Sequence, residues 1–226
     1  PLKNHTTFGC GGGAKAVVFP ETTEQLAEVI KLLGDEAQIL GNGSNVLVCD
    51  EGIDKYAVIT TKIKEVKCTG ESIYADCGAS LAKLSSVAAE NSLAGLEFAY
   101  GIPGTVGGAV YMNAGAYGGA VSDVIEYSIA YNRKSGRVYR LYDCDFSYRY
   151  SKYMRKSNLV CLGAVFALPF GNEAEIKEKM AQNMASRKAN QPLEYPSAGS
   201  YFKRPEGHFA GKLIEDCGAF VVADRY

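Results

Sequence analysis

The chain has 226 residues, 47% of them hydrophobic, 22% charged and 11% aromatic, a composition typical of a soluble globular protein. Its net charge of −1 creates no overall field that favours nucleic acid or an anionic membrane, and no apolar run approaches the roughly 18 residues that span a bilayer. Seven widely spaced cysteines without a C-x-x-C pair, and only two histidines, argue against disulfides or a metal site and favour a reducing cytoplasm.

The N-terminal part of the chain predicts a short strand, a helix and further strands. The strand covers residues 16–20, and a helix over 22–33 follows because a Thr–Thr pair can cap its start and Gly34 can end it. Apolar runs predict strands at 37–40, 46–48 and 56–61. Residues 9–14 match the dinucleotide fingerprint G-x-G-x-x-A, but no strand precedes them and no helix follows, so we interpret them as a flexible turn or as a loop beside a ligand.

The middle of the chain predicts a hairpin, a second helix and three strands. Residues 63–68 and 72–77 form the hairpin, and Ser80 caps a helix that ends near Asn91. The strands cover 124–131, 138–142 and 159–168. The two basic residues of the turn at 132–136 are expected to be solvated. Strands interleaved with a few helices indicate α+β layers and not a regular βαβ repeat.

A boundary is predicted at residues 169–172, where proline and glycine follow a long apolar strand. A helix over 173–189 comes next, with acidic residues in its first half and basic residues at its end, as suits the helix dipole. Beyond it, Pro192 and Pro196 bracket an extended segment.

Two glycine-rich stretches are the first candidates for a ligand site. One covers residues 101–109 and continues through 113–119, and the other covers 41–45. Glycine is used where φ is positive or where another group approaches the backbone closely, and clustered amides can bind phosphate oxygens. The alternative for each stretch is a tightly packed turn. Two such loops in one chain favour a diphosphate cofactor more than either alone.

Two polar side chains are candidates for chemistry. Arg149 follows Asp143 and Asp145; it can pair with one of these carboxylates, or it can hold a substrate carboxylate or developing oxyanion. Ser200 can be a simple turn hydroxyl, or a general acid whose conjugate base is stabilised by the cations that follow it. No G-x-S-x-G elbow surrounds Ser200, so a hydrolase triad fits poorly.

Six motifs, in order, resemble those of the UDP-N-acetylenolpyruvoylglucosamine reductase family. They lie at residues 4–8, 40–45, 101–109, 113–118, 147–149 and 199–203. The sequences at residues 148–151 and 191–196 resemble those of the shorter subclass of this family, which lacks an extra substrate-covering loop. The resemblance implies an α+β fold with a two-subdomain FAD-binding module of the vanillyl-alcohol-oxidase-like (PCMH-type) kind and a smaller substrate-binding domain. We expect these parts at residues 1–62, 63–170 and 171–226.

The resemblance also implies an activity. Noncovalent FAD, with NADPH as hydride donor, would reduce UDP-N-acetylglucosamine enolpyruvate to UDP-N-acetylmuramate in bacterial peptidoglycan synthesis. We expect a cytoplasmic monomer whose partners are NADPH and a UDP-sugar nucleotide, with no nucleic acid and no membrane.

The same resemblance implies residue roles. Arg149 would stabilise charge at the substrate carboxylate, and Ser200 would be the proton donor. The implied FAD-binding residues are Gly41, Asn42, Gly43, Ser44, Asn45, Ile102, Pro103, Gly104, Thr105, Val106, Gly107, Gly108, Ala109, Asn113, Ala114, Gly115, Gly118 and Arg187. The implied substrate-binding residues are Tyr148, Tyr201, Lys203, Arg204 and Lys212.

Two features depart from the family pattern. Gly13 stands where proline is expected, and no residue matches the C-terminal catalytic glutamate that assists Arg149. After Gly218 the chain passes directly into residues 219–222, which resemble a later strand, so we expect an incomplete, truncated substrate domain. The chain is then expected to bind FAD and to reduce substrate poorly. The alternative is a catalytically disabled fragment or remnant of the same family. A third hypothesis is another flavin oxidase of this fold. The lack of a histidine beside the glycine loops, to which flavin could attach covalently, argues against that third hypothesis.

Overall fold

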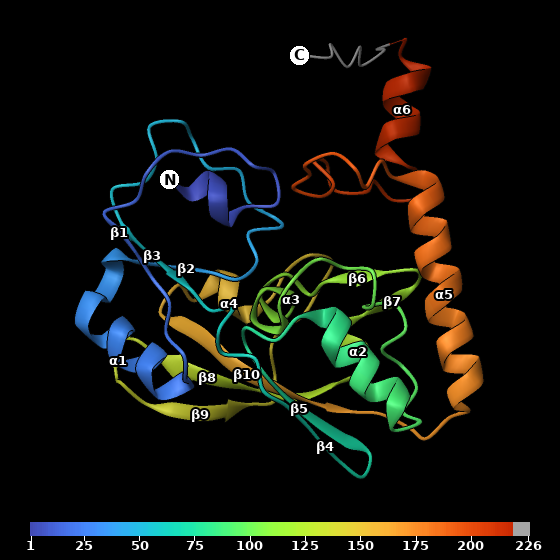
Figure 1. Ribbon diagram of the computed structural model, residues 1–226, viewed down its shortest axis with the longest axis horizontal. Coiled ribbons are helices and arrows are strands. Elements are labelled where there is room, and N and C mark those ends of the chain that lie inside the picture. Colours follow the sequence, from blue (N-terminus) through green and yellow to red (C-terminus); the bar gives the residue numbers. More distant parts are fainter. Residues whose placement is uncertain (219–226) are drawn as a thin grey trace.

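Two sheets organise the computed structural model, which describes residues 1–218 (Figure 1). The smaller sheet is parallel, with strand order β1-β3-β2, and the larger is antiparallel, with strand order β4-β5-β10-β8-β9. The small sheet contains β1 (Ala16–Val18), β2 (Ala37–Leu40) and β3 (Tyr56–Ile59). The large sheet contains β4 (Val66–Thr69), β5 (Ser72–Asp76), β8 (Ile125–Asn132), β9 (Val138–Leu141) and β10 (Leu159–Ala167). The mixture of helices with these two sheets confirms the predicted α+β class.

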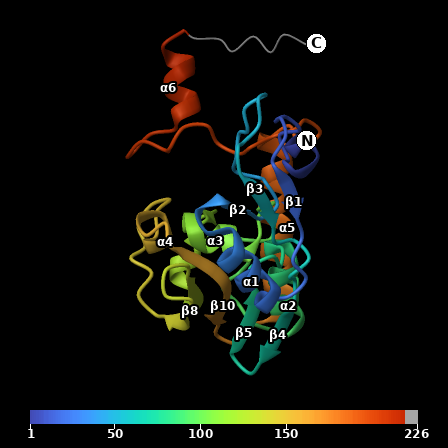
Figure 2. The ribbon, with the colours of Figure 1, turned by 90° about the vertical axis from the view of Figure 1, so that its left-hand side faces the viewer.

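The helices cover the sheets and continue beyond them (Figures 1 and 2). They are α1 (Thr23–Leu33), α2 (Leu81–Glu90), α3 (Val106–Met112), α4 (Lys152–Arg155), α5 (Glu173–Asn190) and α6 (Ala210–Asp216). The short elements are the 3-10 turns Leu2–His5, Gly34–Glu36 and Val121–Asp123 and the hairpin β6 (Gly115–Ala116) and β7 (Gly119–Ala120). Helix α5 runs along α2, against which Ile176 and Met180 are buried, and α6 stands apart beyond the end of α5.

Strand β10 is the centre of the core because it is buried on both faces. Ala164 and Phe166 lie in the cluster formed with α2 and α3, whereas Val160 and Leu162 lie in the cluster formed with α1. A register shift between Cys161 and the next paired residue interrupts the strict alternation of the two faces. Burial on both faces explains why the run reads as continuously apolar, and the predicted strand is confirmed.

Local capping signals place the first two helices where the sequence predicts them. The Thr22 hydroxyl accepts from the backbone N–H of Gln25 at 3.2 Å, and the Ser80 hydroxyl accepts from Lys83 N–H at 3.2 Å. Gly34 ends α1 with a φ of 54°. The third predicted helix is confirmed as α5, which Asn172 caps.

Several predictions were wrong or incomplete. Residues 46–48 are not a strand: Val46 and Val48 pack beside Leu2 without joining a ladder, so their apolar character reflects packing alone. Helices α3, α4 and α6 were not predicted. Arg133 is only partly exposed, because its guanidinium donates to the carbonyls of Gly34 at 2.8 Å and Ala37 at 3.2 Å, whereas Lys134 is exposed as predicted. The strand expected at residues 219–222 lies outside the described residues.

Candidate cofactor and substrate site

The two glycine-rich loops lie against each other, although about sixty residues separate them in the sequence. The side-chain amide of Asn42 donates to the carbonyl oxygen of Pro103 at 2.8 Å. A Cβ at Gly41 would collide with the hydroxyl of Thr105, and a Cβ at Gly104 would lie 3.8 Å from the Ser44 hydroxyl. The structure therefore brings residues 41–45 and 101–105 together as two facing walls.

The facing loops present unused polar groups. Within residues 1–218, the backbone N–H groups of residues 42–45 donate to no protein acceptor. The hydroxyl of Thr105 is buried and has no hydrogen-bond partner among the described residues. Free amides and hydroxyls are the donors that bind phosphate oxygens, and an unpaired buried hydroxyl is costly unless a ligand satisfies it. The residues present fit a dinucleotide diphosphate such as that of FAD.

Part of the second stretch packs the fold. Val106 and Ala109 are buried in the core, and the Gly107 N–H donates to the carbonyl of Cys77 at 2.7 Å. A Cβ at Gly107 would lie 3.0 Å from the Cβ of Cys77, so a larger residue would push α3 away from the residue that follows β5. Packing therefore explains Val106, Gly107 and Ala109, and residues 101–105 remain as the part of the stretch that faces the first loop.

Helix α3 ends at Asn113, which adopts the left-handed conformation with a φ of 42°. Its buried carboxamide donates to the carbonyl of Ser147 at 3.1 Å and accepts from the N–H of Ser122 at 3.0 Å. The chain then forms the β6–β7 hairpin, whose two central residues, Tyr117 and Gly118, both have positive φ, as a type I′ turn requires. Asn113 thereby joins α3 to the segment that carries Arg149.

Arg149 is held by this helix end. Its guanidinium donates to the backbone carbonyls of Asn113 at 3.2 Å and Gly115 at 2.6 Å. The backbone of Arg149 is left-handed, with a φ of 55°, at the tip of a turn closed by two hydrogen bonds between Ser147 and Tyr150. Backbone strain of this kind persists only where the surroundings fix it, and it is enriched at functional sites.

Pairing of Arg149 with a preceding aspartate was one of two predicted arrangements, and it is wrong. Asp143 pairs instead with Lys152 at 3.0 Å, and Asp145 pairs with Arg155 at 3.0 Å. Both aspartates are thus occupied by cations of the short helix α4. Among residues 1–218, the guanidinium of Arg149 donates only to carbonyl oxygens and lies over the ring of its neighbour, Tyr148, so no carboxylate there pairs with its charge.

The segment after α5 passes over the first loop. A Cβ at Gly199 would lie 3.8 Å from the carbonyl of Ser44 and 3.9 Å from the side-chain oxygen of Asn45, which places Ser200 next to this loop. The Arg204 N–H donates to the Tyr148 hydroxyl at 3.2 Å, so the far end of the segment reaches the Arg149 turn.

The other predicted binding residues of the C-terminal part of the chain lie in different places. The side chain of Arg187 on α5 passes beside Gly101, where a Cβ would lie 3.3 Å from its Cδ atom. Tyr201 and Lys203 are exposed. Lys212 lies on α6, where it pairs with Glu215 and Asp216 at 3.2 and 2.9 Å, so the structure does not bring it to the other predicted residues.

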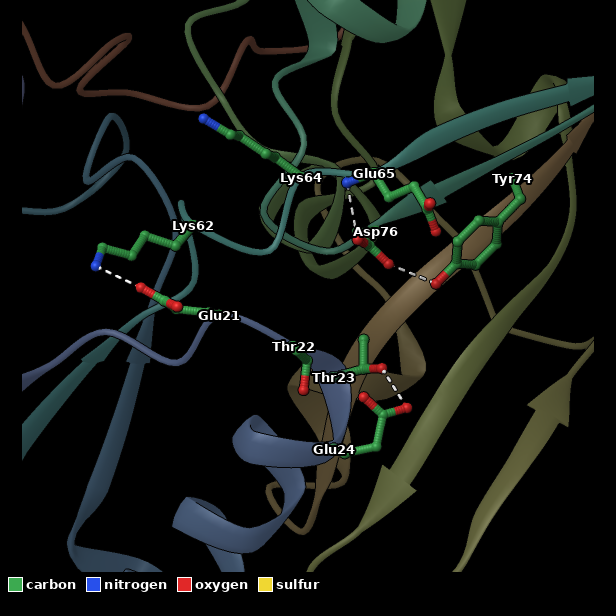
Figure 3. Close-up of a pocket in the computed structure, with 9 residues that line it drawn as sticks. All are labelled: Glu21, Thr22, Thr23, Glu24, Lys62, Lys64, Glu65, Tyr74 and Asp76. Atoms are coloured by element: carbon green, nitrogen blue, oxygen red, sulfur yellow. Dashed lines mark hydrogen bonds and ion pairs between the residues drawn. The ribbon is translucent and has the colours of Figure 1, made fainter.

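A separate hollow of about 550 Å³ lies between the start of α1 and the β4–β5 hairpin (Figure 3). Four of its lining residues are acidic (Glu21, Glu24, Glu65 and Asp76). Asp76 is already satisfied, since it accepts from the Tyr74 hydroxyl at 2.6 Å and from a backbone N–H at 2.8 Å. The lining carries these four acidic residues against two basic ones, Lys62 and Lys64, so it suits a diphosphate less well than the glycine loops do.

Two further classes of site find no support in the described residues. Among residues 1–218, no group of three or more histidine, cysteine or acidic side chains is arranged to hold a metal ion. Within the same range, no helix has the length and apolar character needed to cross a membrane.

Comparison with known proteins first defines the class of protein. Residues 14–142 match the FAD binding domain family. An alkyldihydroxyacetonephosphate synthase structure shares the fold, with a TM-score of 0.52 and 12% identity over 68% of this chain and 31% of that chain. The fold is therefore that of the PCMH-type FAD-binding proteins.

The particular family follows from nearer relatives. A curated UDP-N-acetylenolpyruvoylglucosamine reductase of Caldicellulosiruptor bescii is 49% identical, over 96% of this chain and 71% of the relative. The crystal structure of the corresponding enzyme from Thermus caldophilus matches with a TM-score of 0.82 and 33% identity, over 96% of this chain and 78% of that chain. Residues 191–221 match the C-terminal domain of UDP-N-acetylenolpyruvoylglucosamine reductase. The chain belongs to the UDP-N-acetylenolpyruvoylglucosamine reductase family.

Proposed function

We propose that this chain binds FAD noncovalently and uses NADPH to reduce UDP-N-acetylglucosamine enolpyruvate to UDP-N-acetylmuramate. The observation that carries the proposal is the meeting of the two glycine-rich loops beside Arg149 and the segment that bears Ser200. The named function of the relatives supports it. We further propose a cytoplasmic monomer, with domains at residues 1–62, 63–170 and 171–226, that serves peptidoglycan synthesis.

The cofactor would lie between the loops. The amides of residues 42–45 and the Thr105 hydroxyl would bind its diphosphate, and Arg187 would add a positive charge from α5. FAD, when bound, supplies reversible two-electron chemistry that neither side chains nor backbone can provide.

The remaining residues would act on the substrate. Arg149 presents a permanent charge, held by two carbonyls, to the carboxylate on which negative charge develops. Ser200 would deliver a proton to the substrate carbon. Tyr148, Tyr201, Lys203 and Arg204 would contact the sugar nucleotide, where cations suit the diphosphate. Lys212 requires α6 to approach, because it lies apart in this structure.

The alternative is a chain that binds FAD without catalysing the reduction. One observation favours it: among the described residues, no carboxylate pairs with Arg149 or takes the place of the assisting glutamate. The alternative shares the cofactor site and differs only in the reaction with substrate.

Two half-reactions test both proposals. The purified protein should be yellow and should release its flavin on denaturation; NADPH should bleach it, and the enolpyruvyl sugar nucleotide should restore the colour. Failure of the last step alone supports the disabled alternative. A colourless protein that FAD cannot reconstitute refutes both.

A further inference from the structure

Thr7, in the N-terminal motif at residues 4–8, joins two parts of the candidate site that are far apart in sequence. Its hydroxyl donates to the carbonyl of Ser197 at 2.6 Å, and its own carbonyl accepts from the Ser197 N–H at 3.1 Å. The Thr7 N–H also donates to the carbonyl of Gly43 at 3.2 Å. One residue therefore holds the first glycine loop and the segment after α5 at the same time.

The hydrogen bonds continue from Ser197 toward Ser200. The N–H of Gly199 donates to the Ser197 hydroxyl at 3.1 Å, and Gly199 has a φ of 83°, which turns the chain immediately before Ser200. Three residue steps separate Ser197 from Ser200, so the chain between them spans at most about 10 Å. Fixing Ser197 thus restricts where the Ser200 hydroxyl can lie relative to the Gly43 loop.

The segment needs such attachments because it buries little of itself. Most of residues 191–209 are exposed, so packing contributes little to their order. The attachments nearest Ser200 on either side are the Thr7–Ser197 pair and the hydrogen bond from Arg204 N–H to the Tyr148 hydroxyl. Pro196 also lies near the N-terminal segment, since a Cβ added to Gly9 would be 3.9 Å from the Cβ of Pro196.

We propose that Thr7 is a positioning residue, which sets the location of the Ser200 hydroxyl over the cofactor loop by clamping Ser197 to Gly43. The inference rests on the proposed function, in which Ser200 is the proton donor. Thr7 contacts neither cofactor nor substrate in this role and acts through Ser197.

The test compares three variants of the full chain. Thr7→Val keeps the shape and backbone bonds of Thr7 but removes its hydroxyl, whereas Thr7→Ser keeps the hydroxyl. Thr6→Val is the matched control, because the Thr6 hydroxyl donates to the nearby carbonyl of Cys10 at 3.1 Å and not to the Ser200 segment.

Hydrogen exchange measured by mass spectrometry gives a readout that does not depend on catalysis. Peptides covering residues 195–204 should exchange about fivefold faster in Thr7→Val, the loss expected for one hydrogen bond. Thr7→Ser and Thr6→Val should match the unmodified chain. Equal exchange in Thr7→Val and the unmodified chain would overturn the proposed clamp.

The half-reactions give the second readout. In Thr7→Val, bleaching by NADPH should keep its rate, whereas reoxidation by the enolpyruvyl sugar nucleotide should slow about tenfold, because proton transfer depends on geometry. Faster exchange with unchanged reoxidation would refute the positioning role. An unmodified chain that the substrate does not reoxidise would refute the proposed function and, with it, this role of Thr7, while exchange still decides whether the clamp exists.

Discussion

The guanidinium of Arg149 donates to the main-chain carbonyl of Gly115 at 2.6 Å, across 34 positions of sequence. A second hydrogen bond, from the same guanidinium to the carbonyl oxygen of Asn113, makes the contact bidentate. This arrangement fixes the cation without neutralising it, since carbonyl dipoles orient an arginine but leave its net charge intact. The left-handed backbone of Arg149 lies in the turn that the two hydrogen bonds between Ser147 and Tyr150 close.

Arg149→Lys should slow reoxidation of the reduced protein by the enolpyruvyl sugar nucleotide about 100-fold, because an ammonium cannot reproduce the planar fork that grips two carbonyls. Flavin content and bleaching by NADPH should be unchanged. Arg155→Lys is the matched control, because Arg155 pairs with Asp145 on the surface of α4. Stopped-flow absorbance measures both half-reactions, and an unaltered reoxidation rate in Arg149→Lys would remove Arg149 from the proposed chemistry.

Asn113→Ala should destabilise the protein more than Asn113→Gly, by about 1–2 kcal/mol in the free energy of unfolding. Both variants lose the hydrogen bonds of the carboxamide to Ser147 and Ser122, but only alanine adds the cost of a left-handed backbone. Urea denaturation of the two variants measures the difference. Equal stabilities would show that the positive φ at Asn113 carries no strain.

Gly41→Ala should weaken FAD binding about tenfold or more. The added methyl would collide with the Thr105 hydroxyl and force the two loops apart, and overpacking of this kind costs about 1–3 kcal/mol. Gly13→Ala is the control, since a Cβ there meets nothing within 4 Å. Flavin absorbance per chain after gel filtration reports the loss. Full flavin retention in Gly41→Ala would place the cofactor elsewhere.

The buried thiol of Cys77 predicts a loss of stability at alkaline pH. Burial, followed by the charge of Asp76, raises the pKa of Cys77 from 9.0 to about 12. Between these two pH values the thiol keeps its proton in the folded state and loses it in the unfolded state. The contribution of Cys77 to the free energy of unfolding is therefore complete below about pH 9 and disappears as the pH rises toward 12.

The free energy of unfolding should fall less steeply with pH in Cys77→Ala between these pH values. The slope should be smaller by about 1.4 kcal/mol per pH unit, which corresponds to a difference of one bound proton between the folded and unfolded states. Urea denaturation at a series of alkaline pH values measures the slope. Substituting the exposed Cys49 by alanine serves as the comparison and should leave the slope as it is. A slope that Cys77→Ala does not change would mean that Cys77 ionises equally in both states.

The sequence by itself determined the elements whose signals are local. Thr22, Ser80 and Gly34 begin and end helices through hydrogen bonds and backbone angles within a few residues, and these predictions hold. The two glycine-rich loops are equally visible in sequence, and motif resemblance identified the family that the comparisons establish. Local chemistry is readable because its partners are sequence neighbours.

Only the tertiary structure decided which distant groups meet. Spacing alone left Arg149 beside Asp143 and Asp145, yet both aspartates pair with cations of α4, and Arg149 turns to the end of α3. The bond from Thr7 to Ser197 joins residues 190 positions apart. Such contacts depend on how helices and sheets pack. Burial of the whole core selects that packing, so no local spacing pattern in the sequence reveals which distant residues meet.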